Sequence, residues 1–222
     1  MRVQWFGQSA FALSAGDTTV FIDPFADLSA LASRGITFEY PAIDGIDAAL
    51  VLVTHEHLDH NGVAAIGGDP AILRSTAGIH QSPVGEVTAV ASEHDQDAGT
   101  LRGPNTIFAF ELGGVRVCHF GDFGQRMLRE EQASAIGSVD LLLVPVGDGP
   151  TIGAEQAWTI IERLAPRWVV PMHYRTARTD FLETEEAFVD RAGAITRLPS
   201  SSFETDDLVH SDGPLIVVPA AP

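Results

Sequence analysis

The sequence predicts an α/β protein in which two β-sheets pack against each other and helices lie outside them. Short apolar runs bounded by turn residues are concentrated in the first third of the 222-residue chain, and later runs alternate with segments of helical periodicity. No repeat, linker or low-complexity stretch divides the chain, so we predict one domain over residues 1–222. A helical bundle or a doubly wound sheet is the alternative fold.

The predicted strands are short apolar or alternating runs separated by turn residues. Gly7 and residues 15–17 separate the first three runs, and Asp23 with Pro24 ends the third. Gly113-Gly114 between two later runs is a hairpin signal. In chain order the predicted strands are residues 3–6, 10–13, 18–22, 48–53, 71–73, 86–90, 106–110, 115–120, 139–144, 168–170 and 215–218.

The predicted helices follow from apolar residues at helical spacing. The clearest runs from Gly153 to Leu164, where Ala157, Ile160 and Ile161 fall on one face with Leu164. The mixed sequence of residues 26–47 predicts a surface excursion that carries a short helix. The other predicted helices are residues 62–66, 126–136 and 183–191.

The composition is strongly acidic, with 13 Lys and Arg against 30 Asp and Glu and a formal net charge of −17. Such a surface repels nucleic-acid phosphates and anionic membranes, so we predict neither as a partner. No segment approaches the roughly 18 uninterrupted apolar residues of a membrane helix. The N-terminus lacks the features of a signal peptide, which predicts a cytoplasmic protein. Cys118 is the single cysteine, so an intramolecular disulfide is excluded and a thiolate metal site nearly so.

The segment from Thr54 to Asn61 contains three imidazoles and one carboxylate directly after a buried strand, namely His55, His57, Asp59 and His60. Imidazole nitrogen and carboxylate oxygen are ligands of zinc and similar divalent metals. His55 and His57 are two residues apart, so in an extended loop they point the same way and can share one ion. Asp59 can turn toward a second ion. This loop predicts a metal-dependent hydrolase.

Further candidate ligands stand at the ends of other predicted strands. They are His94, His119, Asp122 and His173. A single histidine after a strand is more often structural than a ligand. Several at the same kind of position, together with the loop, favour a common metal site.

At these residues the chain resembles the metallo-β-lactamase-fold superfamily of metal-dependent hydrolases. The signature His-x-His-x-Asp-His is complete, and the resemblance extends from residues 21–24 to His173. It is closest to the compact branch that includes ascorbate-lactonate hydrolase-like proteins, whose blocks are matched by residues 102–106, 119–122, 145–147 and 171–174. The resemblance implies a four-layer αββα sandwich with two mixed sheets. Gln8, Gln125 and Asp148 depart from the usual residues of that branch and point to a different substrate pocket.

The resemblance also implies how the ligands divide between two ions. His55, His57 and His94 would hold the first ion, Asp59, His60 and His173 the second, and Asp122 would bridge both. Asp23 is expected to orient a ligand histidine, and Asp95 could do the same or be simply exposed. His119 is expected to contact a ligand or the substrate, with a purely structural strand residue as the equal alternative. An imidazole at His57 favours zinc over iron, with Mn²⁺ or Fe²⁺ as alternatives.

The expected reaction is hydrolysis of a small-molecule lactone or carboxylic ester by a hydroxide held between two metal ions, with Asp59 holding this nucleophile. Tyr174, Arg175 and Arg102 are candidate substrate contacts, against the equal alternative of packing for the tyrosine and surface solvation for the arginines. A metal-dependent phosphodiesterase is the second hypothesis. A non-catalytic binding or sensor protein, stapled by its metals, is the third. A homo-oligomer is compatible with the sequence.

Overall fold

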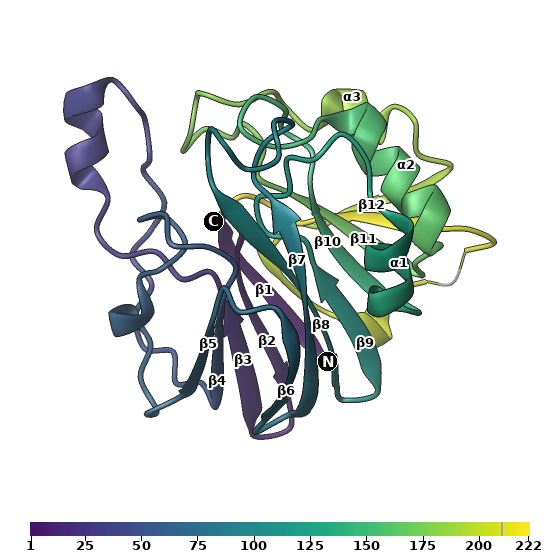
Figure 1. Ribbon diagram of the computed structural model, residues 1–222, viewed down its shortest axis with the longest axis horizontal. Helices are drawn as coiled ribbons and strands as arrows, with labels where there is room; N and C mark the ends of the chain where they lie inside the picture. The colour runs from purple at the N-terminus through teal and green to yellow at the C-terminus, as the bar shows by residue number, and fades with distance from the viewer. Residues whose placement is uncertain (210) are drawn as a thin grey trace.

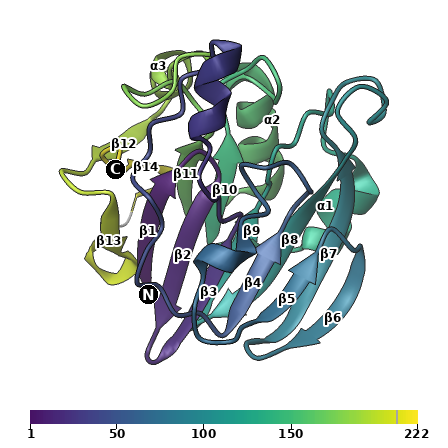
Figure 2. The same ribbon diagram turned by 90° about the vertical axis from the view of Figure 1, so that its left-hand side faces the viewer.

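The computed structural model describes residues 1–209 and 211–222. Two mixed β-sheets pack face to face, and the α-helices lie on the outer face of one of them (Figures 1 and 2). This arrangement confirms the predicted fold class of two mixed sheets with helices outside. Within the described residues, no helix is both long and apolar enough to cross a membrane.

The first sheet has six strands in the order β13-β1-β2-β3-β4-β5. The pairs β13–β1, β1–β2 and β2–β3 are antiparallel. The pairs β3–β4 and β4–β5 are parallel. The bounds are Arg2–Gly7 (β1), Ala10–Ala15 (β2), Thr18–Ile22 (β3), Leu50–Val53 (β4), Ala71–Arg74 (β5) and Ser202–Glu204 (β13).

The second sheet has eight strands in the order β12-β14-β11-β10-β9-β8-β7-β6. The strands from β12 to β9 are parallel, and those from β9 to β6 form antiparallel hairpins. The bounds are Gly78–Ser82 (β6), Gly85–Glu93 (β7), Pro104–Leu112 (β8), Val115–His119 (β9), Leu141–Pro145 (β10), Trp168–Met172 (β11), Ala194–Arg197 (β12) and Leu215–Val218 (β14).

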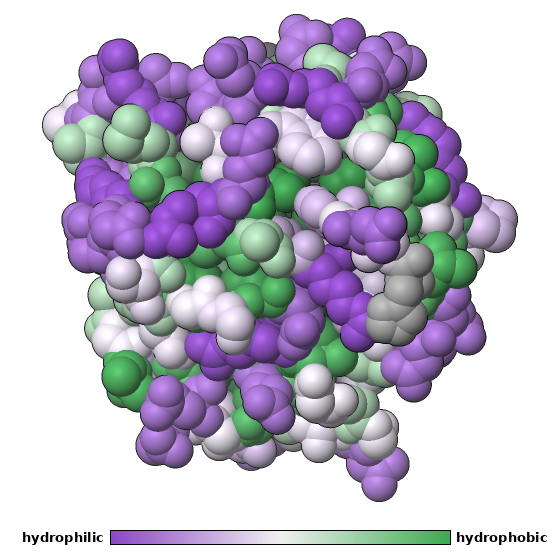
Figure 3. All heavy atoms as spheres, turned by 90° about the vertical axis from the view of Figure 1, so that its right-hand side faces the viewer, coloured by the Kyte–Doolittle hydropathy of each residue, from purple (hydrophilic) through white to green (hydrophobic). Residues whose placement is uncertain are grey.

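Each predicted helical segment contains an α-helix or a 3-10 turn, and the α-helices are shorter than predicted. The helical elements are α1 (Glu130–Ile136), α2 (Ala154–Leu164), α3 (Glu186–Val189) and the 3-10 turns η1 (Ser29–Arg34), η2 (Val63–Ala65) and η3 (Thr205–Asp207). The outer face of the first sheet is covered by η1, η2 and the irregular excursion between β3 and β4, which projects at the left of Figure 1. The face on the opposite side of the molecule is mainly hydrophilic with scattered apolar patches (Figure 3), which suits a solvent-facing surface.

The main core fills the space between the two sheets. Trp5, Phe11 and Leu13 of the first sheet pack there against Phe108 and Phe110 of the second, all fully buried. A smaller apolar cluster lies on the other face of the first sheet, where Phe21 and Val51 meet Phe25 and Tyr40 of the excursion. The alternation of inward and outward residues along each strand places these two sets on opposite faces. The first sheet is therefore packed on both of its faces.

Candidate metal centre

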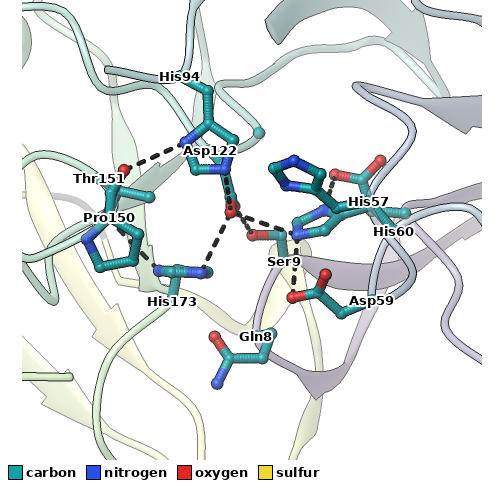
Figure 4. A network of polar contacts seen from close by, with 12 residues as sticks. Gln8, Ser9, His57, Asp59, His60, His94, Asp122, Pro150, Thr151 and His173 are labelled. Atoms are coloured by element: carbon teal, nitrogen blue, oxygen red, sulfur yellow. Dashed lines mark hydrogen bonds and ion pairs between the residues drawn. The ribbon is translucent and has the colours of Figure 1, made fainter. Parts of the chain in front are cut away.

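The candidate site lies along one edge of the sandwich, where strands from both sheets end. β1, β3 and β4 of the first sheet and β7, β9 and β11 of the second run in the same direction within their sheets, as their pairing shows. The residues that follow these strand ends converge in Figure 4. Loops at the carboxyl ends of strands are where α/β proteins commonly build their sites.

Asp122 lies at the centre of the cluster, in the loop that follows β9. Its Oδ2 is 3.2 Å from His94 Nε2, 3.2 Å from His173 Nε2 and 3.3 Å from His60 Nε2. The Nε2 of His55 is 4.0 Å away. One carboxylate oxygen therefore faces four imidazole nitrogens, and the contacts of His60, His94 and His173 can be followed in Figure 4.

The loop after β4 supplies the remaining donors. His55 Nε2 lies 3.0 Å from His57 Nδ1, and Asp59 Oδ2 lies 3.5 Å from His60 Nε2. Two groups of residues each bring their donor atoms within 4.8 Å of one another. One group is His55, His57 and His94, and the other is His55, His60 and Asp122. The first group is the predicted first ligand set. The second group contains His60 and Asp122, which the predicted second set also includes. The other two members of that set lie beside them: Asp59 contacts His60, and His173 contacts Asp122. All seven predicted ligands are thus brought together.

Each of the four buried imidazoles has its other ring nitrogen anchored. His55 Nδ1 lies 3.0 Å from Thr54 Oγ1, and His60 Nδ1 lies 2.9 Å from Asp23 Oδ2. His94 Nδ1 donates to the carbonyl oxygen of Pro150 at 3.1 Å, and His173 Nδ1 lies 3.5 Å from Thr151 Oγ1. A proton on each anchored nitrogen leaves a lone pair on Nε2, which is the form that binds a metal.

The cluster fits divalent cations on the chemistry of its donors. His60 Nε2 is fully buried and has no hydrogen-bond partner among the described residues, although carboxylate oxygens lie around it. A buried ring nitrogen without a partner costs free energy unless something binds it. Anchored imidazoles and carboxylates around such an atom form a donor set typical of zinc and related ions.

Burial and the mutual charges of the cluster shift its ionisation. Burial lowers the pKa of His55 to about 2, so this ring is neutral. Burial opposes a charge on His60, but the carboxylates of Asp122, Asp59 and Asp23 outweigh it and raise its pKa. Burial likewise opposes the charge of Asp122, but the rings of His173 and His60 lower its pKa. The centre therefore holds charge only in opposed pairs, as buried ions require.

The cluster is open on the side of the ligand loop. His57 is exposed, and the side chain of Asp59 is 26% exposed, whereas His60 and Asp122 are buried. Burial disfavours the charge of Asp59, but the His60 ring outweighs it and lowers the pKa of this carboxyl. An ionised carboxylate thus stands where solvent can reach the cluster.

Asp23 contacts His60, one of the predicted ligands, at 2.9 Å. Its carboxylate accepts hydrogen bonds from the backbone N–H of Thr54 at 2.8 Å and from the Thr54 hydroxyl at 2.7 Å, in addition to the contact with His60. The hydroxyl of Thr54 in turn lies against His55. One buried carboxylate therefore contacts His60 directly and His55 through the Thr54 hydroxyl, and both histidines are predicted ligands.

His119 does not point its nitrogens at the cluster. Its Nδ1 accepts a hydrogen bond from the backbone N–H of Gly121 at 3.0 Å, so its Nε2 carries the proton and donates to the carbonyl oxygen of Ser9 at 2.9 Å. The hydroxyl of Ser9 donates to Asp122 Oδ1 at 3.0 Å. His119 thus holds the residue that holds Asp122, and burial lowers the pKa of His119.

The other predicted contacts serve the surrounding loops. Asp95 accepts four backbone N–H groups between residues 97 and 102, one of them from Arg102, whose side chain is exposed. Arg175 is exposed and donates to the carbonyl oxygen of Leu182. Tyr174 is buried and packs on Trp5 with ring centroids 5.4 Å apart. In these contacts Asp95, Arg175 and Tyr174 organise loops and core.

Several residues of the site carried no sequence signal of their own. Ser9, Thr54, Asn105 and Thr151 are small polar residues that hold ligands or the Asp122 backbone, for example Asn105 Oδ1, which accepts from the Asp122 N–H at 3.0 Å. Thr54 alone could have been found, because it lies directly between the predicted strand and the first ligand. The others come from distant parts of the chain.

The site and the fold define a metal-dependent hydrolase of the metallo-β-lactamase superfamily, and the comparisons with known proteins agree. Residues 2–173 match the family model described as the β-lactamase superfamily domain, so the chain belongs to that family. It is 31% identical over 217 residues to a UPF0173 metal-dependent hydrolase of Thermus thermophilus, covering 86% of this chain and 91% of that protein. It is 32% identical over 206 residues to another from Methylobacterium nodulans, covering 78% and 85%.

Solved structures show the same fold. A Thermotoga maritima chain described as a Zn-dependent hydrolase of the superfamily superposes with a TM-score of 0.77 at 27% identity, over 98% of this chain and 97% of that one. An isothiocyanate hydrolase from Delia radicum gut bacteria superposes with a TM-score of 0.64 at 14% identity, over 85% and 90%. The second likeness concerns the fold alone.

Proposed function

We propose that this protein hydrolyses a small-molecule lactone or carboxylic ester with the help of two divalent cations, zinc in the first place. The observation that carries the proposal is the convergence of His60, His94 and His173 on a single oxygen of Asp122, each with its other ring nitrogen anchored. Such anchoring prepares several nitrogens at once to face a cation.

In this proposal the donors form two sets with Asp122 between them, because Asp122 Oδ2 lies 3.2 Å from His94 Nε2 and 3.3 Å from His60 Nε2. His55, His57 and His94 would hold one cation, and Asp59, His60 and His173 the other. Divalent cations in such a set supply Lewis acidity, which makes water nucleophilic at neutral pH and polarises a carbonyl group. The remaining roles belong to side chains of the chain itself.

Asp59 is the residue that can move a proton. In ester hydrolysis the water oxygen forms a bond to the carbonyl carbon, the bond from that carbon to the alcohol oxygen breaks, and one water proton ends on the leaving alcohol. Asp59 stands at the open side of the cluster with its carboxylate partly exposed. It can accept that proton from the water and return it to the leaving oxygen.

The surroundings favour an ester or lactone over a phosphodiester. The net charge of −17 disfavours an anionic substrate outside the reach of bound cations. Exposed apolar side chains stand on the loops that follow the ligand-bearing strands, namely Leu58, Leu101, Met127 and Phe181. Arg175, which like Phe181 follows β11, donates to the Leu182 carbonyl oxygen. Apolar loops around a polar cluster suit a substrate with an uncharged organic part.

The test combines metal content with parallel assays. Protein purified without added metal is analysed by elemental mass spectrometry, and the loaded protein is assayed on a panel of lactones and aryl esters and on bis(p-nitrophenyl) phosphate. We expect two metal equivalents and turnover of lactones or esters. Asp59→Asn should lower kcat by about 10²–10⁴-fold. The control Glu56→Gln alters an exposed carboxylate of the same loop that pairs with Arg74 at 2.9 Å, and it should keep full activity.

The outcomes separate the candidate reactions. Turnover of the phosphodiester alone would replace the proposed reaction with phosphodiester hydrolysis. Asp59→Asn with full activity would remove Asp59 from the proton transfer. A loaded protein without turnover of any substrate in the panel would favour a binding or sensor role.

A further inference from the structure

Gln8 occupies the turn between β1 and β2, at the same edge as the ligands. Its neighbour Ser9 donates to Asp122, and its own carbonyl oxygen accepts the backbone N–H of His173 at 3.3 Å. The indole N–H of Trp5 donates to the same carbonyl at 2.9 Å. Figure 4 shows the side chain of Gln8 near His173 and Asp59, across the cluster from His94. Gln8 is thus fixed beside two predicted ligands.

The side-chain amide of Gln8 is buried without a partner. Its exposure is 0%, and neither Nε2 nor Oε1 has a hydrogen-bond partner among the described residues. Burial raises the pKa of Tyr40, and its contacts with Thr176 and with the backbone and side chain of Gln8 oppose this rise. The approach of the Tyr40 hydroxyl to the Gln8 amide lacks hydrogen-bond geometry, whereas this hydroxyl lies 3.0 Å from Thr176 Oγ1. Buried polar side chains are nearly always paired, because an unpaired one loses its bonds to water and gains none.

The same protein shows what a buried structural glutamine looks like. Gln125 and Gln132 exchange two hydrogen bonds, with Nε2 to Oε1 distances of 3.0 Å and 2.8 Å. Their remaining amide atoms bond to the backbone groups of Met127, Ala91, Glu93 and Arg129. Gln8 has none of these connections, so packing requirements alone do not account for an amide at this position.

The backbone of Gln8 is also in an unfavourable conformation. Its φ of +47° lies in the left-handed region, which residues with a side chain rarely adopt. The two hydrogen bonds to its carbonyl oxygen hold it there. Strain of this kind persists where the surrounding structure enforces it, and such residues concentrate at functional sites. Both the unpaired amide and the strained backbone lower the stability of the folded protein, and neither makes a compensating contact when no ligand is bound.

We propose that Gln8 is a substrate-contacting residue of the hydrolase, whose amide donates a hydrogen bond to the substrate oxygen that becomes negatively charged during the attack. This inference rests on the proposed function. Either orientation of the amide presents one donor and one acceptor. A donor that is already in place and dehydrated stabilises a developing oxyanion more than a flexible surface group does. The contact is worth most in the transition state, so its loss acts on kcat more than on KM.

The test is Gln8→Met, which keeps the length of the side chain and removes its polar atoms. In the metal-free protein the thermal midpoint should stay equal or rise by about 2–6 °C, because an unpaired buried amide is replaced by an apolar group. Metal content should not change. In the loaded enzyme kcat on the active ester or lactone should fall by about 10²–10³-fold. Gln8→His, which keeps a ring N–H, should recover part of this loss.

Gln132→Met is the matched control, because the Gln132 amide on α1 is buried and fully paired. It should lower the thermal midpoint and leave kcat within about twofold of the unsubstituted enzyme. Gln8→Met with kcat within about twofold would overturn the proposal. So would a loss of kcat accompanied by a lowered midpoint, since Gln8 would then resemble a structural glutamine.

A second readout separates this inference from the proposed function. If the unsubstituted protein turns over no ester or lactone, the proposed reaction fails. The role of Gln8 is then decided by binding of acetohydroxamate, a carbonyl ligand of zinc, to the zinc-loaded protein in a calorimetric titration. Gln8→Met should weaken this binding by about tenfold, the loss of one hydrogen bond to a charged oxygen, and Gln132→Met should not. Equal binding by the unsubstituted and Gln8→Met proteins would overturn the proposal.

Discussion

Asp23→Asn is expected to weaken both predicted metal sites, although Asp23 itself holds no metal. The carboxylate is fully buried and accepts three hydrogen bonds, from the Thr54 N–H, the Thr54 hydroxyl and His60 Nδ1. The backbone N–H cannot reverse its role, so the single oxygen of an asparagine must stay on Thr54 N. The new NH₂ group then takes the place of Oδ2.

That exchange reverses the hydrogen bonds at two ligands. Facing the NH₂ group, His60 Nδ1 must accept, which places the proton of the neutral ring on Nε2 and removes the lone pair that would bind a cation. The Thr54 hydroxyl must also accept from the NH₂ group, which frees its own proton for His55 Nδ1, 3.0 Å away. His55 then carries its proton on Nε2. One isosteric substitution thereby shifts the tautomers of two ligands, one in each predicted set.

The expected magnitude is a loss of about 10–100-fold in affinity at each site, the usual effect of removing a group that orients a ligand. Zinc binding is measured by competition with a chromogenic chelator, and folding is checked by thermal unfolding of the metal-free protein. Thr54→Val is the matched variant. It breaks the connection from Asp23 to His55 and keeps the one to His60, so it should weaken only the site that contains His55, His57 and His94.

Two results would refute this reasoning. Asp23→Asn with both zinc affinities unchanged would show that Asp23 does not set the tautomers. Equal losses at both sites in Thr54→Val would show that the effect is a general loosening of the edge. The selective result depends on hydrogen-bond direction alone, which distinguishes it from a loss of packing.

Three other predictions concern stability and reactivity. Burial lowers the pKa of His119 below its ordinary value of 6.5, so the unfolded chain binds the proton more readily; acidification from about pH 7.5 to pH 5.5 should destabilise the protein, and less so in His119→Gln, as followed by urea unfolding. Gly62→Ala would place a Cβ 2.4 Å from the backbone nitrogen of Ala26 and should cost about 1–3 kcal/mol, whereas Gly193→Ala, with nothing within 4 Å, should be neutral in the same thermal unfolding assay. Cys118 is fully buried, and burial raises the pKa of its thiol, so Ellman's reagent should label it only after denaturation; fast labelling of the native protein would contradict its placement in the core.

Each predicted strand that the structure confirms contains at least three buried residues, with the exception of β5, an edge strand that has none. β4 and β10 are buried along their whole length and read as continuous apolar runs. The strands that the sequence did not predict, β6, β12 and β13, all lie at sheet edges and are half exposed. An edge strand is held by backbone hydrogen bonds from one neighbour and needs no apolar pattern. Composition alone therefore cannot reveal it.

The same distinction applies to the candidate site. His55, His57, Asp59 and His60 could be predicted because one loop holds them, and a dense set of ligand types is visible in sequence. The partners that orient them are ordinary polar residues brought in by the fold. Ser9 reaches Asp122 across 113 positions of sequence, and His94 reaches the Pro150 carbonyl across 56. No local pattern contains such a contact, because it depends on which strands end at the same edge.

The backbone at this edge indicates how ordinary strands can present ligands. Gln8, Asp23 and His173 each follow a strand of the sandwich and have φ values of +47°, +50° and +50°. Along a strand, successive side chains point to opposite faces of the sheet. A residue that continued the strand would therefore direct its side chain at one face of the sheet. A left-handed residue breaks this alternation and lets the side chain project over the edge. The strain costs stability at three positions, and it is held by backbone hydrogen bonds such as Asp23 N–H to the Leu52 carbonyl at 2.9 Å. The edge therefore trades local stability for the convergence of side chains on Asp122, which is the trade expected of a site built for binding and chemistry.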